Sequence, residues 1–363
     1  MPETAPAPEI PEVDLTTFTL ERAAELGDKP ALIDGPSGRT ITYEQLDGGT
    51  RALAASLASR GIGRGDVVAI YMPNLPEYAL IFHGVIRAGA TSTTANPLYT
   101  AHELGHQLTD SGARMLFTVG PFLENARAAA AEAGLDPESI IVVGEGDGDE
   151  TTLAELLDGS GDPPQVGYAI ESDLAVIPYS SGTTGLPKGV MLSHRNLIAN
   201  VLQFAEVIPV EEDDVLIGVL PFFHIYGQTV IMNAGLHYGA TIVTMPRFDL
   251  GGFLGLIAEH RVTMTYVVPP IALALAKHPA VDEADLSSVR MVMSGAAPLS
   301  EDLSRAVAER VGAPTIQGYG MTELSPVTHV APIDSRKGGS IGPAIPGTEC
   351  RIVDPETGED AEV

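Results

Sequence analysis

Short apolar runs alternate with longer amphipathic stretches along almost the whole chain. The short runs are rich in Val, Ile and Leu and predict β-strands, whereas the stretches between them carry apolar residues at helical spacing. Strands are expected at Val67–Met72, Arg114–Val119, Ile140–Val143, Leu174–Tyr179, Val215–Leu220, Ala240–Met245, Met264–Val268, Val289–Met293 and Thr315–Gln317. Helices are expected at Tyr43–Arg60, Glu77–Arg87, Phe122–Ala133, Arg195–Val207, Phe253–Glu259 and Glu301–Val311.

Most of the predicted strands are apolar at consecutive positions rather than at every second position. A strand of this kind is buried on both faces, which is typical of a parallel sheet covered by helices on each side. Thr42 with Gln45, and Ser300 followed by acidic residues, predict the N-caps of two helices. The pattern therefore predicts the α/β class, with largely parallel sheets flanked by helices.

The pattern changes near the end of the chain. Residues 339–363 are glycine-rich and strand-like, with a turn predicted at Asp354–Gly358. We therefore expect one large domain over residues 1–338, followed by the first strands of an incomplete all-β unit over residues 339–363. Two acidic stretches, residues 144–150 and 159–164, flank a short helix and predict a surface connection.

Composition narrows the class of protein. Twenty Lys and Arg stand against 48 Asp and Glu, for a formal net charge of −28, so neither nucleic acid nor an anionic membrane is an expected partner. The acidic, proline-rich first fourteen residues are unlike a signal peptide, and the longest apolar stretch, Tyr266–Ala276, is too short to span a membrane. The single cysteine, Cys350, suits a reducing compartment, so we expect a soluble, cytoplasmic protein.

The segment with the most chemistry is YSSGTTGLPKG, residues 179–189. It follows a predicted buried strand and combines four Ser and Thr hydroxyl groups, three glycines and Lys188, one of only four lysines in the chain. Glycines let successive backbone N–H groups converge on an anion, and the lysine adds positive charge. The segment departs from the Walker A pattern, because Pro187 precedes the lysine and a strand-like run follows it. It predicts a phosphate-binding loop between two strands, with an ordinary polar hairpin as the alternative.

Three further clusters follow predicted strands, where ligands bind in open α/β sheets. QGYGMTE (317–323) offers an aromatic ring, a hydroxyl and a carboxylate, and it lacks the helix-opening glycine of a dinucleotide fold. SGAAP (294–298) is a run of small residues that a flat ring could approach, and PFFHIYG (221–227) contains a histidine beside aromatic residues. For each cluster a plain turn or a buried core histidine is the alternative interpretation.

Two other patterns match catalytic motifs but fail on context. HELGH (102–106) fits the H-E-x-x-H pattern of zinc proteases, yet Thr100 stands three residues before Glu103, which predicts a capping box that occupies this glutamate. Gly105 also weakens the helix that would direct both histidines at one metal. GGSIG (338–342) fits the G-x-S-x-G esterase pattern, but prolines follow where that motif needs a helix.

Taken together and in this order, YSSGTTGLPKG, PFFHIYG, SGAAP and QGYGMTE resemble the adenylate-forming superfamily of acyl-CoA synthetases, luciferases and peptide-synthetase adenylation domains. HIYGQTVIMNAGL, YVVPPIALALAKHP and QGYGMTELSPV are most similar to 4-coumarate–CoA ligases and their bacterial relatives. The resemblance implies two packed, helix-flanked sheets followed by a distorted β-barrel. It also implies ATP, Mg²⁺ and coenzyme A as cofactors and cosubstrates, and a carboxylic acid as the substrate.

The resemblance implies a role for each matching residue. The β- and γ-phosphates would be held by Ser180, Ser181, Gly182, Thr183, Thr184 and Lys188. Thr184 and Glu323 would hold Mg²⁺, and Thr322 would contact the α-phosphate. Adenine would be framed by Ala296, Ala297, Pro298, Gln317, Gly318 and Tyr319. His224 would steer the carboxylate, Arg247 would lie near the coenzyme A phosphates, and the acyl pocket would be formed by Tyr226, Gly295, Gly320, Pro326 and Val327.

The resemblance further implies a reaction on 4-coumarate or a related cinnamate or aryl acid. The family's ribose-binding aspartate, hinge and C-terminal domain with its catalytic lysine do not occur in residues 1–363. We therefore expect this chain alone to adenylate slowly and to form almost no thioester. The alternatives are a medium- or long-chain fatty acyl-CoA synthetase of the same mechanism, a zinc protease, or a fragment that binds nucleotide without turnover.

Overall fold

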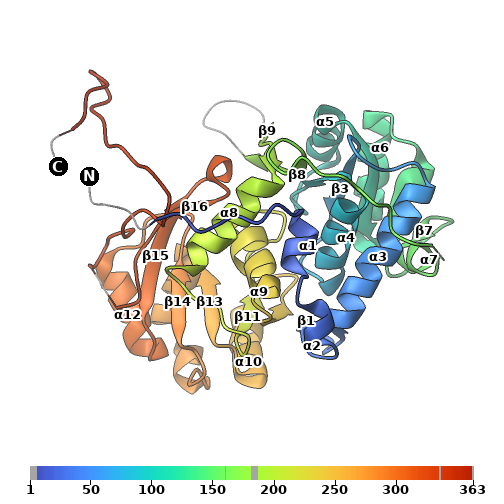
Figure 1. Cartoon of the computed structure of the whole chain (residues 1–363). Helices are drawn as coiled ribbons and strands as arrows, with labels where there is room; N and C mark the ends of the chain where they lie inside the picture. The colour runs from blue at the N-terminus through green and yellow to red at the C-terminus, as the bar shows by residue number, and fades with distance from the viewer. Residues whose placement is uncertain (1–5, 160, 181–186, 335–336, 362–363) are drawn as a thin grey trace.

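The computed structural model describes residues 6–159, 161–180, 187–334 and 337–361, and Figure 1 shows them as two sheets with their helices. The first sheet has the strand order β16-β15-β14-β13-β11-β12-β1-β2. Its strands are β1 (Pro30–Asp34), β2 (Thr40–Thr42), β11 (Val215–Gly218), β12 (Thr241–Thr244), β13 (Met264–Val267), β14 (Met291–Ser294), β15 (Thr315–Gly320) and β16 (Val327–Val330). Neighbouring strands are parallel except in the β1–β2 and β15–β16 pairs at the two edges.

The second sheet has the strand order β10-β8-β4-β3-β5-β6-β7, and β9 pairs with the end of β8. Its strands are β3 (Val67–Tyr71), β4 (Thr91–Thr94), β5 (Ala113–Val119), β6 (Ile140–Val143), β7 (Thr151–Thr152), β8 (Leu174–Ser180), β9 (Lys188–Gly189) and β10 (Leu192–Ser193). Only the pairs that β8 makes with β9 and β10 are antiparallel.

Helices cover the sheets and fill the space between them. They are α1 (Leu15–Thr19), α2 (Ala23–Leu26), α3 (Tyr43–Ser59), α4 (Pro76–Arg87), α5 (Ala101–Ser111), α6 (Leu123–Ala133), α7 (Leu153–Leu157), α8 (His194–Ala205), α9 (Ala234–His237), α10 (Leu250–His260), α11 (Pro269–Lys277) and α12 (Glu301–Val311). Short 3₁₀ turns are η1 (Gly120–Phe122), η2 (Pro137–Ser139), η4 (Pro279–Glu283) and η5 (Thr322–Leu324), and η3 (Gly227–Asn233) is a π-helix that runs directly into α9. In Figure 1, α1, α8 and α9 occupy the middle of the view, between β13–β15 on one side and β3–β8 on the other.

The α/β class and the largely parallel, helix-flanked sheets predicted from the hydrophobic pattern are confirmed. Every strand and helix expected from the sequence is present, with ends that differ by a few residues. Both predicted caps form, since the Thr42 hydroxyl accepts from the Gln45 amide in a complete capping box and Ser300 caps α12. These ends are set by local hydrogen bonds, which is why a short sequence pattern was enough to find them.

Strand β4 lay outside these predictions, because its sequence, Thr-Ser-Thr-Thr, is polar. All four residues are nevertheless buried in the middle of the second sheet. The hydroxyls of Thr91, Thr93 and Thr94 donate to the carbonyl oxygens of Leu174, Ile177 and Phe223, at 2.9, 2.8 and 2.8 Å. A β-branched hydroxyl residue can occupy a buried strand when a carbonyl accepts its proton, and these partners are distant in sequence.

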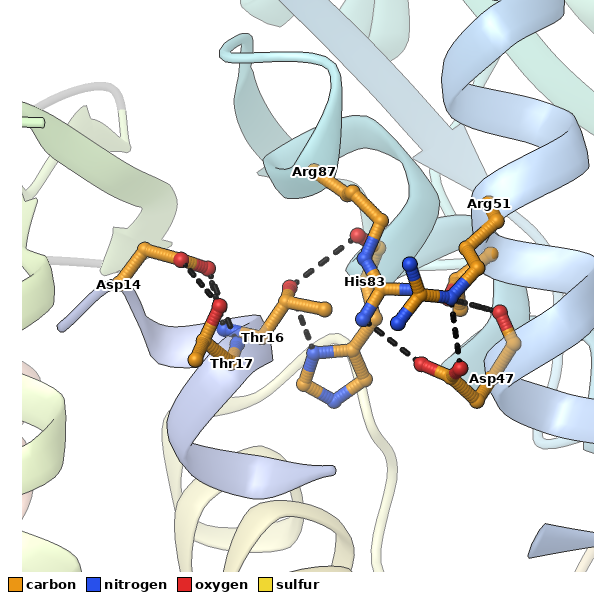
Figure 2. A network of polar contacts seen from close by, with 8 residues as sticks. Asp14, Thr16, Thr17, Asp47, Arg51, His83 and Arg87 are labelled. Carbon is orange, nitrogen blue, oxygen red and sulfur yellow. Dashed lines mark hydrogen bonds and ion pairs between the residues drawn. The ribbon is translucent and has the colours of Figure 1, made fainter. Parts of the chain in front are cut away.

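Helix α1 contacts α4 through polar interactions with the buried His83, as Figure 2 shows. The Thr16 hydroxyl lies 3.2 Å from His83 Nδ1 and 3.1 Å from the His83 carbonyl oxygen. Asp14 caps the helix through the Thr16 and Thr17 amides. Behind His83, the Arg87 guanidinium pairs with the Asp47 carboxylate at 2.8 Å. Burial, reinforced by the charge of Arg87, lowers the pKa of His83 to about 3.

We expect the free energy of unfolding to decrease as the pH falls below about 6.5, with a slope of up to about 1.4 kcal/mol per pH unit from His83 alone. In this range the unfolded chain binds a proton at this histidine, whereas the folded chain does not. Urea unfolding between pH 5 and 7.5 measures the slope, which should shrink in His83→Gln. The exposed His102 provides the control, and an equal change of slope in His102→Gln would contradict the assignment.

After β16 the described residues form turns and two isolated bridges, His329 to Ala344 and Val353 to Asp360. Gln203 of α8 donates to the Pro346 carbonyl oxygen at 2.9 Å, and beyond that contact the segment leads away from the body in Figure 1. The predicted boundary between residues 338 and 339 stays a prediction. Among the described residues, no helix combines the length and apolar character needed to cross a membrane.

Candidate active site

A cavity of about 990 Å³ opens where the two sheets meet. One wall consists of the ends of β14 and β15 and the segment that leads to β16. The other walls are the turn before η3 and the β8–β9 hairpin. The lining residues are Ser180, Lys188, Gly189, Val190, His224, Ile225, Tyr226, Met293, Gly295, Ala296, Gly318, Tyr319, Gly320, Met321, Thr322, Glu323, Pro326 and Val327. All four clusters singled out in the sequence therefore contribute to one cavity, although up to 143 positions separate them in the chain.

The β8–β9 hairpin brings the polar end of the cavity together. Ser180 and Lys188 are cross-strand partners, as expected for a loop between two strands. The Ser180 hydroxyl donates to Glu323 Oε1 at 3.2 Å, which joins the hairpin of the second sheet to η5 beyond the first sheet. Ser181, Gly182, Thr183 and Thr184 lie outside the described residues. The hairpin thus presents a lysine, a hydroxyl and, across the cavity, a carboxylate.

A tyrosine anchors this hairpin from behind. The Tyr179 hydroxyl donates to Asp110 Oδ2 at the end of α5, at 2.6 Å. Burial, with the Asp110 carboxylate, raises the pKa of Tyr179, so the phenol keeps its proton. The same ring lies against Gly189, where a Cβ atom would stand 2.7 Å from Ile177 and 3.2 Å from the ring. Glycine at this position therefore lets the lysine-bearing strand pack closely on β8.

Only part of the predicted adenine frame lines the cavity. Ala296, Gly318 and Tyr319 lie on its wall, with Tyr319 47% exposed. Thr322, predicted to contact the α-phosphate, also lines the cavity. Ala297 and Pro298 are exposed outside the lining, and so is Arg247, which follows β12.

The predicted adenine residue Gln317 has a different position. Its side chain is buried and turned onto the backbone of Leu299, accepting from the amide at 3.0 Å and donating to the carbonyl at 3.2 Å. This glutamine ties the SGAAP turn to β15. Ala296 within that turn has a backbone φ of +68°, which costs a non-glycine residue about 1–3 kcal/mol and needs such support.

The predicted acid-binding residues all line the cavity. The lining includes every one of them: His224, Tyr226, Gly295, Gly320, Pro326 and Val327. His224 Nδ1 accepts the Tyr226 amide at 3.2 Å, so the neutral ring carries its proton on Nε2. His224 is exposed, but desolvation by the surrounding protein lowers its pKa and keeps the ring neutral at pH 7. The histidine therefore offers an N–H donor to a carboxylate without adding a charge.

Two lining glycines, Gly295 and Gly320, let neighbouring residues pack closely at the cavity wall. At Gly295 a Cβ atom would stand 2.8 Å from the Tyr226 ring, and at Gly320 it would collide with the Pro326 carbonyl oxygen. Tyr226 itself is buried, and its hydroxyl donates to the Met293 carbonyl oxygen at 3.4 Å. The absence of a side chain at these two positions lets the aromatic ring and β16 close on the cavity.

Five lining residues lay outside the sequence-based set, namely Gly189, Val190, Ile225, Met293 and Met321. Gly189, Ile225 and Met321 lie inside the predicted motifs without an assigned role, and Val190 and Met293 each adjoin one, so widening the motifs by one position would have included them. Met293 is the buried residue just before SGAAP, and hydrophobic pattern alone assigned it to the core.

The H-E-x-x-H segment has the structure that its capping box predicted. The Thr100 hydroxyl and backbone pair with Glu103 at the start of α5, which confirms the capping box. His102 is 81% exposed and pairs with Glu132 at 2.6 Å. Throughout the described residues, no group of three or more His, Cys, Asp or Glu side chains is arranged to hold a metal ion.

Comparison with known proteins gives a consistent result. A model of the family described as AMP-binding enzyme matches residues 20–363. The chain is 42% identical over 358 residues to 4-coumarate–CoA ligase 3 of Oryza sativa subsp. japonica, covering 95% of this chain and 63% of the rice enzyme.

Solved structures agree on the fold. A long-chain fatty-acid–CoA ligase from Archaeoglobus fulgidus superposes with a TM-score of 0.91 at 28% identity, covering 99% of this chain and 75% of that one. ATP-bound MatB from Rhodopseudomonas palustris gives a TM-score of 0.83 at 30% identity, covering 96% of this chain and 68% of that one.

Proposed function

The chain belongs to the AMP-binding enzyme family, and from this premise we propose that the protein activates a carboxylic acid with ATP and transfers the acyl group to coenzyme A. The acid attacks the α-phosphate of ATP to give an acyl-adenylate and pyrophosphate. The thiol of coenzyme A then displaces AMP and loses its proton, which gives the thioester. The proposed substrate is 4-coumarate or a related cinnamate or aryl acid, in line with the rice relative. Since the chain spans 63% of that relative, the activity of a whole protein is part of the proposal.

One observation carries the proposal: a single cavity is lined by a lysine, a carboxylate, a neutral histidine and apolar side chains. An acid and a triphosphate must meet in one water-poor space for an in-line displacement. Lys188 supplies positive charge for the phosphates, and His224 supplies an N–H donor for the carboxylate. Tyr226, Gly295 and Val327 form the wall along which a flat aromatic acid would lie.

The donors at the polar end fit a magnesium ion. The Glu323 carboxylate and the Ser180 hydroxyl are hard oxygen ligands within 3.2 Å of one another, and Mg²⁺ prefers such ligands beside substrate phosphates. Glu323, with Thr184 outside the described residues, is proposed to hold the ion, which neutralises charge on the phosphates when bound.

The remaining predicted residues have proposed roles of the same kind. Thr322 is proposed to donate to the α-phosphate, and Gly318, Tyr319 and Ala296 to flank adenine. Arg247 is proposed to meet the phosphates of coenzyme A at the exposed end of β12. The division into a domain over residues 1–338 and the start of a β unit over 339–363 is part of the same proposal.

The proposal is tested by ATP–pyrophosphate exchange with residues 1–363 across 4-coumarate, benzoate and medium- and long-chain fatty acids. We expect exchange that depends on the acid and is fastest with 4-coumarate. Fastest exchange with a fatty acid would favour the alternative that the Archaeoglobus structure suggests. ATP binding without exchange for any acid would contradict the proposed activity.

Replacing Gly295 by alanine should raise the KM for the acid by about tenfold or more, because one extra carbon in a tight pocket costs about 1–3 kcal/mol. The new Cβ atom would press on the Tyr226 ring at 2.8 Å, and since both residues line the cavity, the shape of the proposed acid pocket would change. The KM for ATP should stay within about twofold of the wild-type value, since the nearest atoms to the new Cβ belong to Tyr226 and not to Lys188 or Ser180.

Gly255 on α10 provides the matched control, because a Cβ atom there meets open space. Gly255→Ala should leave both KM values unchanged. Equal changes in the KM for ATP and for acid in Gly295→Ala would show that Gly295 does not belong to the acid end.

A further inference from the structure

The turn that precedes His224 accepts hydrogen bonds from side chains of the second sheet and of the segment after β3. Residues 218–223 lead from the end of β11 in the first sheet to His224, which lines the cavity. Their backbone is bonded by side chains that follow β3 and end β4 of the second sheet, more than 120 positions away in the chain. None of these side chains lines the cavity.

Asn74 makes the central contacts. It stands between β3 and α4, is 5% exposed, and uses both ends of its amide. Its Nδ2 donates to the carbonyl oxygens of Gly218 and Leu220, each at 2.8 Å, and its Oδ1 accepts the Phe222 amide at 2.8 Å. Both amide protons and one oxygen lone pair are thereby used on a single turn, which fixes three of its backbone groups at once.

Thr94 and Tyr78 hold the next residues of the turn. The Thr94 hydroxyl donates to the Phe223 carbonyl oxygen at 2.8 Å, one residue before His224. The Tyr78 ring packs edge-on against Phe222, with centroids 5.7 Å apart.

The π-helix η3 also contacts this turn, through Gln228 and Gly227. The side-chain amide of Gln228 donates to the Phe222 carbonyl oxygen at 3.3 Å, and a Cβ atom at Gly227 would collide with the Pro221 carbonyl oxygen. The turn therefore has almost no freedom to shift without breaking a buried hydrogen bond.

We propose that Asn74 and Thr94 are positioning residues for the acid-activation step: they reach across from the second sheet and fix the turn that carries His224 at the cavity wall. The inference rests on the proposed function, because His224 matters to the reaction only if the cavity binds an acid. Neither residue touches the substrates, so both act through the backbone of residues 218–223. The same contacts make the relative placement of the two sheets a determinant of where His224 stands.

The consequence is selective. Among the described residues, no hydrogen bond joins residues 218–223 to Ser180 or Lys188. Thr94 pairs with Pro178 of β8 through its backbone, which Thr94→Val retains, so phosphate binding should be independent of the clamp formed by the side chains of Asn74 and Thr94. The carboxylate-binding end depends on it, because a displacement of about 1 Å at a reacting group can cost about 100-fold in rate. A role confined to general stability would instead affect both ends equally.

The test compares Thr94→Val with Thr94→Ser. Valine keeps the shape and removes the hydroxyl, whereas serine keeps the donor to Phe223. In ATP–pyrophosphate exchange with 4-coumarate, Thr94→Val should lower kcat/KM for the acid by about tenfold and leave the KM for ATP within about twofold. Thr94→Ser should retain most of the wild-type value. Asn74→Ala should have a larger effect in the same direction, if it folds.

The matched control is Thr91→Val on the same strand. Thr91 is also buried and also donates to a carbonyl oxygen, but its partner Leu174 begins β8 within the second sheet. Thr91→Val should leave the acid-dependent kcat/KM unchanged. If it lowers kcat/KM as much as Thr94→Val does, the positioning role is refuted.

Hydrogen exchange tests the clamp without relying on activity. Peptides that cover residues 218–226 should exchange about tenfold faster in Thr94→Val than in wild type, with the rest of the chain unchanged. Unchanged exchange in this segment, or a uniform increase over the chain, would overturn the proposal. If wild type activates no acid, the proposed function fails, and exchange in residues 218–226 still decides whether the clamp exists.

Discussion

Replacing Lys188 by alanine should weaken ATP binding by about 10- to 150-fold, because a hydrogen bond to a charged group contributes about 1.5–3 kcal/mol. Lys188 lines the cavity from β9, and no other lysine or arginine among the described residues does so. Its side chain is exposed, so the free energy of unfolding should change by no more than about 0.5 kcal/mol. Calorimetric titration with MgATP, together with urea unfolding, measures both quantities on the same preparation.

The chain contains a matched control in Lys277, which is exposed at the end of α11 and lies outside the cavity lining. Lys277→Ala changes the net charge of the protein by the same amount as Lys188→Ala. It should leave the affinity for ATP unchanged, whereas an equal loss in both variants would reflect long-range charge alone. An unchanged affinity in Lys188→Ala would show that the hairpin is not the phosphate site.

Replacing Asp214 by alanine should lower the free energy of unfolding by up to about 3–5 kcal/mol, the cost of removing one member of a fully buried ion pair. Arg290 keeps 34% of its side chain exposed, which moderates this cost. The Asp214 side chain is 4% exposed and accepts from the Arg290 guanidinium at 2.8 and 2.6 Å and from the Thr263 hydroxyl at 2.6 Å. The Glu211 amide adds a fourth donor at 2.8 Å. These contacts join the starts of β11, β13 and β14. Removing the Asp214 carboxylate would break them and leave Arg290 without its ion-pair partner.

The same carboxyl should make stability depend on pH. Burial by itself would raise the pKa of Asp214, but hydrogen bonds from Arg290, Thr263 and the Glu211 amide outweigh it and hold the pKa below its usual range. A carboxyl with a depressed folded pKa stabilises the protein above its unfolded pKa of about 3.9, and this contribution is lost as the pH falls through the folded pKa. Urea unfolding of wild type and Asp214→Ala at pH 7 and pH 3 should therefore give a smaller difference at the lower pH.

Asp285 offers the comparison for a surface pair. It lies 3.0 Å from Arg261, and both side chains are more than half exposed. Asp285→Ala should lower the free energy of unfolding far less than Asp214→Ala, as solvent screens such pairs. Equal losses for Asp285→Ala and Asp214→Ala would mean that burial is not what makes the Asp214 pair important.

Much of the fold followed from local patterns. Continuous apolar runs such as Ile140–Val143 marked strands of a parallel sheet, because only a strand buried on both faces is apolar at every position. Thr42 and Ser300 marked helix starts through hydrogen bonds to residues three positions away. The polar strand β4 escaped the same logic, since its hydroxyls are satisfied by carbonyls of β8 and of the turn before His224.

The candidate site divides in a similar way. Residue types that a triphosphate or a carboxylate needs, such as Lys188, Glu323 and His224, stand out in the sequence, and all three line one cavity. Gln317 also stood out, yet both ends of its side-chain amide bond to the backbone of Leu299, a contact that no spacing rule predicts. Asn74 attracted no attention, because an asparagine before a helix usually serves the local turn rather than a strand end in another sheet.

By itself the sequence determined the α/β class, the approximate places of the predicted strands and helices, and the four motifs, because each depends on residues within a few positions of one another. Only the tertiary structure decided that the motifs meet in one cavity, which groups face it, and that side chains of the second sheet hold the turn before His224. The physical reason is the range of the interactions. Caps and apolar periodicity act along the chain, whereas the hydrogen bonds of Asn74, Thr94 and Gln317 exist only after strands distant in sequence have packed together.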